Sequence, residues 1–259
     1  MRELKRAGRS LAWSLSLSGG LLGVLMSAMP VASAIAGPND YIRLPTVESG
    51  EREIDFKYGQ QRNRDGSTEA ANSLGYGVGV NNYWFTEIYA KYKQAPGEST
   101  TFDAWECENR FQLTETGQYA VDVGFLLEIE RPLDRTEGYE VTWGPLFQKE
   151  WGRWQGNFNV LVQQHVLADA KFDTELLYQA QLKYRAQEKL EWGMQAFGNL
   201  GQWDNWRASA LQEHKIGPAM FGKFKTGMKQ AIKWNAAWLF GLTDATPGTT
   251  LRLQTEYEF

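Results

Sequence analysis

The chain alternates apolar and polar residues over most of its length beyond residue 53. The alternation is strict at residues 54–58, and it recurs at 74–80, 119–130 and 176–185. Successive side chains of a β-strand point to opposite faces, so a period of two gives each strand one apolar and one polar face. The pattern therefore predicts an all-β protein whose strands separate two different environments.

Twelve segments of this kind can be recognised. They span residues 54–61, 72–80, 84–93, 102–113, 119–130, 139–150, 155–165, 174–185, 189–199, 213–224, 231–241 and 249–259. Most are close to the roughly 9–11 residues with which a tilted strand crosses a bilayer. We predict a closed antiparallel transmembrane β-barrel of about 12 strands. A two-sheet sandwich also alternates and is the soluble alternative.

The connections between these segments alternate in length. The short ones are residues 81–83, 114–118, 152–154 and 186–188, and the longer ones are 62–71, 94–101, 131–138, 166–173, 200–212 and 242–248. Short turns at one end and long loops at the other are typical of an outer-membrane barrel, in which the short side is periplasmic. An even number of strands then places both chain ends in the periplasm, and a sandwich does not require this asymmetry.

Aromatic residues make up 14% of the chain, and many fall where strands end. Tryptophans at 84, 151, 154 and 192 lie beside short turns, whereas Tyr92, Trp105 and Tyr139 lie toward the long loops. Tyr and Trp favour the level of the lipid headgroups because their rings are apolar and carry one polar group. We predict two interfacial belts.

The first 36 residues have the features of a secretory signal peptide. A basic start is followed by an apolar stretch at residues 11–29 and by small residues at Ala34 and Ala36. Such a sequence predicts export and cleavage near Ala36, and Pro30 argues against a retained transmembrane helix. The predicted organisation is a signal peptide at 1–36, a periplasmic N-terminal segment at 37–53 and the barrel at 54–259.

Composition excludes several classes of function. Removing residues 1–36 leaves 23 basic and 30 acidic residues, a net charge of −7. No basic stripe or RNA-binding motif is present, so we expect no nucleic-acid partner. The single Cys107 cannot form an internal disulfide or a thiolate cluster, and it falls on the lipid-facing side of its strand. We expect no metal and no cofactor.

The C-terminal residues carry a resemblance to a known group of proteins. Residues 250–259 alternate, with Tyr257 third from the end and Phe259 at the terminus. This segment resembles the C-terminal signature of the Gram-negative outer-membrane β-barrel superfamily. The resemblance implies location in the outer membrane, contact with its lipid, and recognition of Tyr257 and Phe259 by the barrel-assembly machinery. It also implies that the last strand closes the barrel against the first.

The polar faces of the strands supply candidate lumen residues. They are Glu106, Glu108, Arg110, Glu128, Glu130, Lys183, Arg185, Lys223, Lys233 and Arg252. Acidic residues fall toward the loop side and basic ones toward the turn side, a pattern suited to selecting ions. A structural network of ion pairs that packs the lumen explains the same residues equally well.

Other motifs carry less functional information. Gly75, Gly77 and Gly79 alternate with apolar residues and predict a closely packed part of the lumen wall. Two similar Gly-Pro segments, at 144–149 and 217–223, predict β-bulges because proline removes a ladder donor.

An enzyme is one of the functions to be considered for such a barrel. Outer-membrane lipases need a serine activated by a histidine, and neither His165 nor His214 has a serine two positions on. We therefore predict that the protein is no enzyme but a small porin or substrate-selective channel for passive transport of a small solute. A closed barrel with a structural or partner-binding role is the alternative, followed by a lipid-modifying enzyme.

If the acidic lumen residues select ions, their charge sets the preference of the channel. We expect the reconstituted barrel to conduct weakly, and Glu106→Gln combined with Glu128→Gln to lower its preference for cations in reversal-potential measurements. Unchanged selectivity in the double variant would refute the selectivity hypothesis and leave the ion-pair network.

Overall fold

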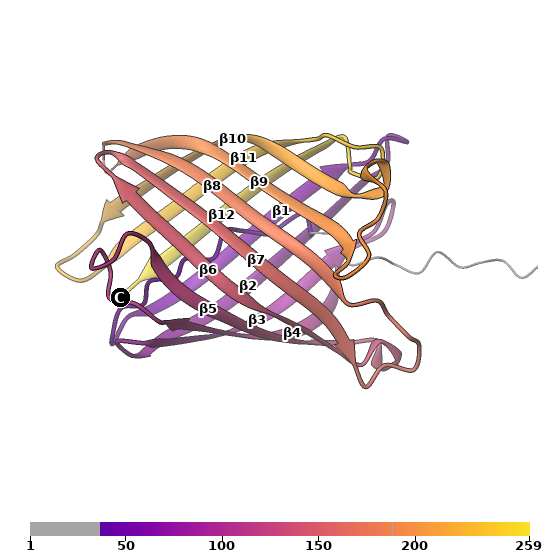
Figure 1. Cartoon of the computed structure of the whole chain (residues 1–259), viewed down its shortest axis with the longest axis horizontal. Helices are drawn as coiled ribbons and strands as arrows, with labels where there is room; N and C mark the ends of the chain where they lie inside the picture. Colours follow the sequence, from indigo (N-terminus) through magenta and orange to yellow (C-terminus); the bar gives the residue numbers. More distant parts are fainter. Residues whose placement is uncertain (1–36, 188) are drawn as a thin grey trace, which may run out of the picture. The chain divides into compact units, whose positions relative to one another are not determined.

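The computed structural model describes residues 37–187 and 189–259, so the predicted signal peptide lies outside the described residues. Twelve antiparallel strands close into a barrel in which each strand pairs with its sequence neighbours (Figure 1). Two short 3₁₀ turns, Arg135–Glu137 and Ser209–Leu211, lie in the connections. The predicted fold class and strand number are confirmed.

The strands closely follow the predicted segments. They are β1 Arg52–Arg62, β2 Thr68–Asn81, β3 Trp84–Gln94, β4 Thr101–Gln112, β5 Asp122–Pro132, β6 Tyr139–Trp151, β7 Trp154–Val166, β8 Glu175–Gln187, β9 Leu190–Gln202, β10 Glu213–Lys225, β11 Ala231–Gly241 and β12 Thr249–Glu258.

Closure joins the first strand to the last. The pairing of β1 with β12 runs from Glu53 opposite Glu258 to Arg62 opposite Thr249. The backbone N–H of Phe259 donates to the carbonyl of Arg52 at 2.9 Å, which extends the contact to the final residue. The barrel therefore has no free edge, as the C-terminal pattern predicted.

The alternation of the sequence becomes an outside and an inside. Ile88 on β3 is 58% exposed on the outer face, whereas its neighbour Glu87 is 2% exposed on the inner face. An apolar exterior around a polar interior is the arrangement required of a barrel surrounded by lipid. The residues that the structure describes include no helix long and apolar enough to cross a membrane.

Outward aromatic rings gather near both ends of the barrel. Near the short turns, the rings of Trp154, Tyr184 and Trp192 lie 4.9–6.1 Å apart between centroids. Toward the loops, Phe102 contacts Tyr92 and Trp105, with centroids 5.6 and 5.4 Å apart. Both groups lie where the sequence predicted interfacial belts.

The connection between β4 and β5 is longer than predicted. The segment expected to begin at residue 119 becomes a strand only at Asp122. Side chains hold the preceding residues in a turn, because the Asp122 carboxylate accepts from the N–H of Gly117 at 2.6 Å and the Thr114 hydroxyl accepts from the N–H of Val123 at 2.8 Å. Local side-chain bonds of this kind compete with the ladder.

The two Gly-Pro segments are not the bulges predicted for them. The registers on either side of Gly144-Pro145 and of Gly217-Pro218 are unchanged, although neither dipeptide is paired with the following strand. Instead, the neighbouring strand approaches each glycine closely: a Cβ at Gly144 would lie 2.0 Å from the carbonyl oxygen of Val160. Because glycine has no side chain, the neighbouring strand fits against it without a change of register. The register shifts of the sheet lie elsewhere, for example between Gly79 and Asn81.

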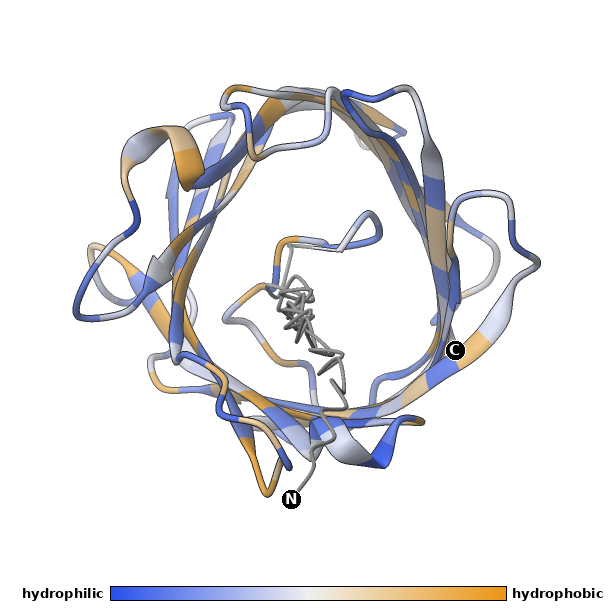
Figure 2. Ribbon diagram, turned by 90° about the vertical axis from the view of Figure 1, so that its right-hand side faces the viewer, coloured by the Kyte–Doolittle hydropathy of each residue, from blue (hydrophilic) through white to orange (hydrophobic). Residues whose placement is uncertain are grey.

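The N-terminal segment differs most from its prediction. The sequence assigned residues 37–53 to the periplasm, but β1 begins at Arg52 and residues 37–47 run inside the barrel, followed by an exposed turn at 48–50 (Figure 2). Three wall glycines make room for this segment: a Cβ at Gly59, Gly79 or Gly124 would lie 2.0, 1.9 or 2.8 Å from its backbone. The segment occupies the lumen because its polar groups find partners on the inward faces of the strands.

Adding a side chain at one of these glycines should weaken the packing of the N-terminal segment against the barrel wall. Gly59→Ala puts a methyl group against the carbonyl of Pro38, and we expect a loss of about 1–3 kcal/mol in the free energy of unfolding, measured by urea titration in lipid vesicles. Gly248→Ala is the matched control, because its Cβ meets nothing closer than 3.5 Å. An equal effect of the two substitutions would contradict this interpretation.

Candidate functional site in the barrel lumen

A row of carboxylates crosses one side of the lumen. The strand registers place Glu258 opposite Glu53, Glu87 opposite Glu108, and Glu108 opposite Glu128, with Gly77 of β2 between Glu53 and Glu87. Like charges directly opposite each other destabilise a sheet. This row therefore requires cations, and the fold supplies them from two sources.

The first source is the barrel wall itself. Lys91 donates to Glu106 at 2.8 Å and also binds Glu130, and Arg110 lies 3.2 Å from Glu108. On β1, Lys57 lies 3.1 Å from the Asp55 carboxylate. These side chains share the inward faces of their strands with the carboxylates, so the alternation of the sequence is enough to bring them together.

The second source is Arg43 of the N-terminal segment. Its guanidinium donates to Glu108 on β4 at 3.2 Å and also binds Glu128 on β5. Its backbone is held from other strands, because Asn159 on β7 donates to its carbonyl at 2.9 Å and Gln179 on β8 accepts from its N–H at 3.4 Å. Arg43 thus links the acidic part of the wall to an amide-lined part.

The residues flanking Arg43 reinforce this position. Tyr41 donates its hydroxyl to Glu108, and burial raises the pKa of the Tyr41 phenol well above its ordinary value, so the group remains a donor. Ile42 turns to the opposite wall and packs into a buried apolar cluster. That cluster comprises Ile42, Phe197, Ala219, Phe221, Ala237 and Leu239.

Amide side chains cover the wall formed by β6 to β9. Gln155 donates to Gln148 at 3.1 Å and to Asn157 at 3.0 Å, Gln181 donates to Asn157 at 3.2 Å, and Gln195 donates to Gln181 at 2.7 Å. The result is a continuous, uncharged network that offers both donors and acceptors toward the lumen.

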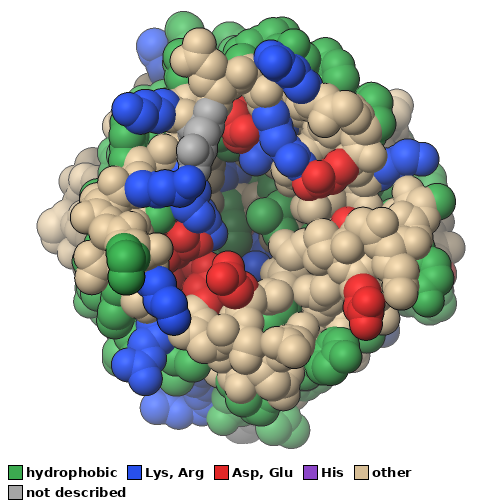
Figure 3. Space-filling view, turned by 90° about the vertical axis from the view of Figure 1, so that its left-hand side faces the viewer, with side chains coloured by type: hydrophobic (Ala, Val, Ile, Leu, Met, Phe, Trp, Pro, Cys, Tyr) green, Lys and Arg blue, Asp and Glu red, His purple; other side chains and the backbone are tan. Residues whose placement is uncertain are grey.

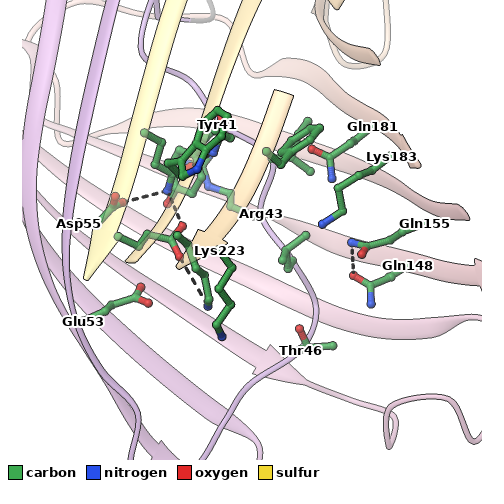
Figure 4. Close-up of a pocket in the computed structure, with 18 of the residues that line it drawn as sticks. Tyr41, Arg43, Thr46, Glu53, Asp55, Gln148, Gln155, Gln181, Lys183 and Lys223 are labelled. Atoms are coloured by element: carbon green, nitrogen blue, oxygen red, sulfur yellow. Dashed lines mark hydrogen bonds and ion pairs between the residues drawn. The ribbon is translucent and has the colours of Figure 1, made fainter. Parts of the chain in front are cut away.

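Between the N-terminal segment and the turn end of the barrel lies a cavity of about 670 Å³. Figure 3 shows the barrel hollowed at this end, with acidic and basic side chains around the opening. Figure 4 shows Lys183 and Gln181 on one side of the cavity and Glu53 and Asp55 on the other, with Lys223 between them. Most of the strands that line the cavity contribute at least one polar side chain to it.

The basic residues predicted for the turn side do lie there, and each is paired. Lys183 lies 3.1 Å from Glu191, Lys223 lies 3.1 Å from Glu258, and Arg185 binds Glu150. Lys233 contacts Glu51 at 3.5 Å, Glu256 at 3.7 Å and also Glu258. The turn side therefore holds ion pairs rather than isolated positive charge.

The predicted acidic residues form one cluster. Glu106, Glu108, Arg110, Glu128 and Glu130 all face inward and are joined through Lys91 and Arg43. Arg252 also faces inward, but it lies apart, 3.2 Å from Asn235 and over the ring of Phe197. Sequence reasoning missed Arg43, Tyr41, Lys57 and Lys91.

Strand parity was enough to find two of those missed residues. Lys57 and Lys91 share an inward face with acidic residues of their own strand or of its neighbour. Arg43 and Tyr41 lie before the first strand, where no alternation indicates which way a side chain points. The sequence therefore contained no sign that these two residues enter the lumen.

The glycines of β2 serve as the predicted close-packed wall. A Cβ at Gly75 would lie 2.3 Å from the ring of Tyr89, and one at Gly77 would lie 2.4 Å from the ring of Phe85. The rings of Phe85 and Tyr89 on β3 occupy the space left at these two glycines, and the Tyr89 hydroxyl donates to Asp55 on β1 at 2.7 Å.

The two carboxylate groups that could ligate a metal already surround side-chain cations. Glu106, Glu108 and Glu128 offer ligand atoms within 4.8 Å of one another, as do Glu51, Glu53 and Glu258. Arg43 binds two members of the first group, and Lys233 binds two of the second. The protein's own cations neutralise both groups.

Both histidines have structural partners. His165 contacts the carbonyl of Glu137 at 3.0 Å and stacks on Phe172, while His214 contacts the Tyr178 hydroxyl at 2.9 Å and Gln212 at 3.0 Å. These contacts hold both rings in the framework of the barrel wall.

No protein-family profile matches the chain, and no curated protein sequence matches it. Solved structures resemble it despite low identity. The NanC porin is 10% identical, with a TM-score of 0.54 over 80% of this chain and 98% of that one. An outer membrane channel from Pseudomonas putida F1 is 11% identical, with a TM-score of 0.56 over 85% and 98%. The translocator domain of the autotransporter NalP from Neisseria meningitidis is 10% identical, with a TM-score of 0.53 over 82% and 88%.

These similarities establish the fold. The chain is a closed antiparallel β-barrel, and its fold is similar to that of these outer-membrane proteins.

Proposed function

We propose that this protein is an outer-membrane channel for passive diffusion of small polar solutes. The observation that carries the proposal is the cavity of about 670 Å³, lined by many polar side chains, that opens at the turn end of the closed barrel. A twelve-stranded barrel lies between small barrels that side chains fill and larger porins with open channels. The similarity of the fold to two channel proteins supports the same conclusion.

The width of the path is set by the N-terminal segment. Tyr41, Arg43 and Thr46 border the cavity, and Arg43 bridges the acidic wall and the amide-lined wall, so the segment narrows the lumen. Amides and paired charges can replace the hydration of a polar solute without attracting one sign of charge strongly. We therefore propose a narrow path suited to small solutes that form hydrogen bonds.

The proposal includes location and partners. The apolar exterior and the aromatic residues near both barrel ends suit contact with outer-membrane lipid, with the turn end in the periplasm. Export by the N-terminal signal peptide and insertion by the barrel-assembly machinery, which would read Tyr257 and Phe259, complete it. A closed structural barrel is the second candidate, favoured by the extensive ion pairing within the lumen.

Removing the segment should widen the path. We expect deletion of residues 38–48 to raise single-channel conductance in planar bilayers several-fold, because the deleted residues occupy the lumen. Leu74→Ala, on the lipid-facing side of β2, is the control and should leave conductance unchanged. If neither the parent nor the deletion variant conducts, the channel is excluded and the structural barrel is favoured.

A further inference from the structure

We infer that residues 37–51 form a displaceable plug and that Arg43 is the latch that holds it closed. The inference rests on the proposed channel function, but it concerns how the path is opened. It identifies Arg43 as the residue that determines the width of the conduction path.

The plug is hinged at its C-terminal end. Backbone bonds join Gly50 N–H to the carbonyl of Gly79, and Gly79 N–H to the carbonyl of Glu51, both at 2.8 Å. Gly50 has a φ of 77°, in the left-handed region that glycine adopts freely. Strand β1 starts directly afterwards at Arg52, so this end is anchored to the sheet.

Beyond the hinge, side-chain contacts attach the plug to the wall. Val47 N–H donates to Gln112 at 2.7 Å, Asn39 donates to Ser73 at 3.4 Å, and Lys215 donates to the carbonyl of Gly37 at 3.1 Å. These bonds each reach one strand. Arg43 differs because its side chain and backbone together contact β4, β5, β7 and β8.

Arg43 also differs from these other contacts because it pairs with two buried carboxylates. Glu108 and Glu128 are opposed in register on neighbouring strands, 0% and 5% exposed, and Arg43 lies between them as a shared counter-ion. When the plug is seated, the Arg43 guanidinium binds both carboxylates. When the plug leaves, Glu128 loses this partner while Glu108 keeps Arg110. Hydrogen bonds to charged groups are stronger than neutral ones, so the seated state depends chiefly on this contact.

Thiol accessibility tests the latch independently of conduction. In a Cys107→Ala background, Ile42→Cys places a thiol at a plug position that is 8% exposed and packed in the apolar cluster. The folded barrel in lipid vesicles is treated with a small maleimide, and the labelling rate is measured by mass spectrometry. We expect slow labelling in this parent and labelling at least about tenfold faster with Arg43→Gln, a factor that corresponds to about 1.4 kcal/mol.

Matched variants separate the latch from general loss of a cation. Lys93→Gln removes a cation that lies 2.6 Å from Asp103, outside the acidic cluster, and it should leave the labelling rate unchanged. Arg43→Lys keeps the charge but loses the forked geometry, and it should give an intermediate rate. Thr46→Cys, which borders the cavity, should label readily in every background.

The outcomes distinguish the two hypotheses. Equal labelling of Ile42→Cys in the parent and in the Arg43→Gln variant, both shown to be folded by heat-dependent gel mobility, overturns the latch even if the barrel conducts. Fast labelling with Arg43→Gln in a barrel that conducts in neither state keeps the latch and overturns the channel. If Arg43→Gln fails to fold, Glu128→Gln makes the same prediction from the partner side.

Discussion

The closure of the sheet, which leaves no strand edge unpaired, is the constraint on which this barrel depends. Within a lipid bilayer an unpaired N–H or carbonyl has no water to bind, so a sheet can span the membrane only when it has no edge. The ladder between β1 and β12 meets this requirement, and it continues to the bond from Phe259 to Arg52. Once the sheet is closed, alternate side chains face either the outside of the barrel or its lumen, and the charged side chains of the site lie on the lumen side.

The division into an outer and an inner face explains the composition of the lumen. Acidic residues share the inward faces of neighbouring strands, and their mutual repulsion is relieved by Lys91, Arg110 and the intruding Arg43. The opposite wall is lined with amides that bind one another without charge. The N-terminal segment lies between these two surfaces because its backbone hydrogen-bonds to the amides and Arg43 pairs with the carboxylates.

Much of the architecture could be predicted because it depends on local periodicity. The strand segments, the inward acidic residues and the glycine wall at Gly75 and Gly77 all follow from parity along a strand. The predictions that were wrong concern places where local bonds or close approach override the pattern. Thr114 and Asp122 hold a turn where a strand was expected, and Gly144 accommodates a neighbouring carbonyl without a bulge.

The sequence by itself determined the fold class, the number of strands and which residues face inward, because a period of two has the same meaning in every strand. Only the tertiary structure decided that residues 37–47 enter the lumen and that Arg43 joins Glu108 and Glu128. Those contacts link residues more than sixty positions apart, and no local pattern records them. They arise because closing the barrel creates an enclosed surface of buried charge that a nearby segment can neutralise.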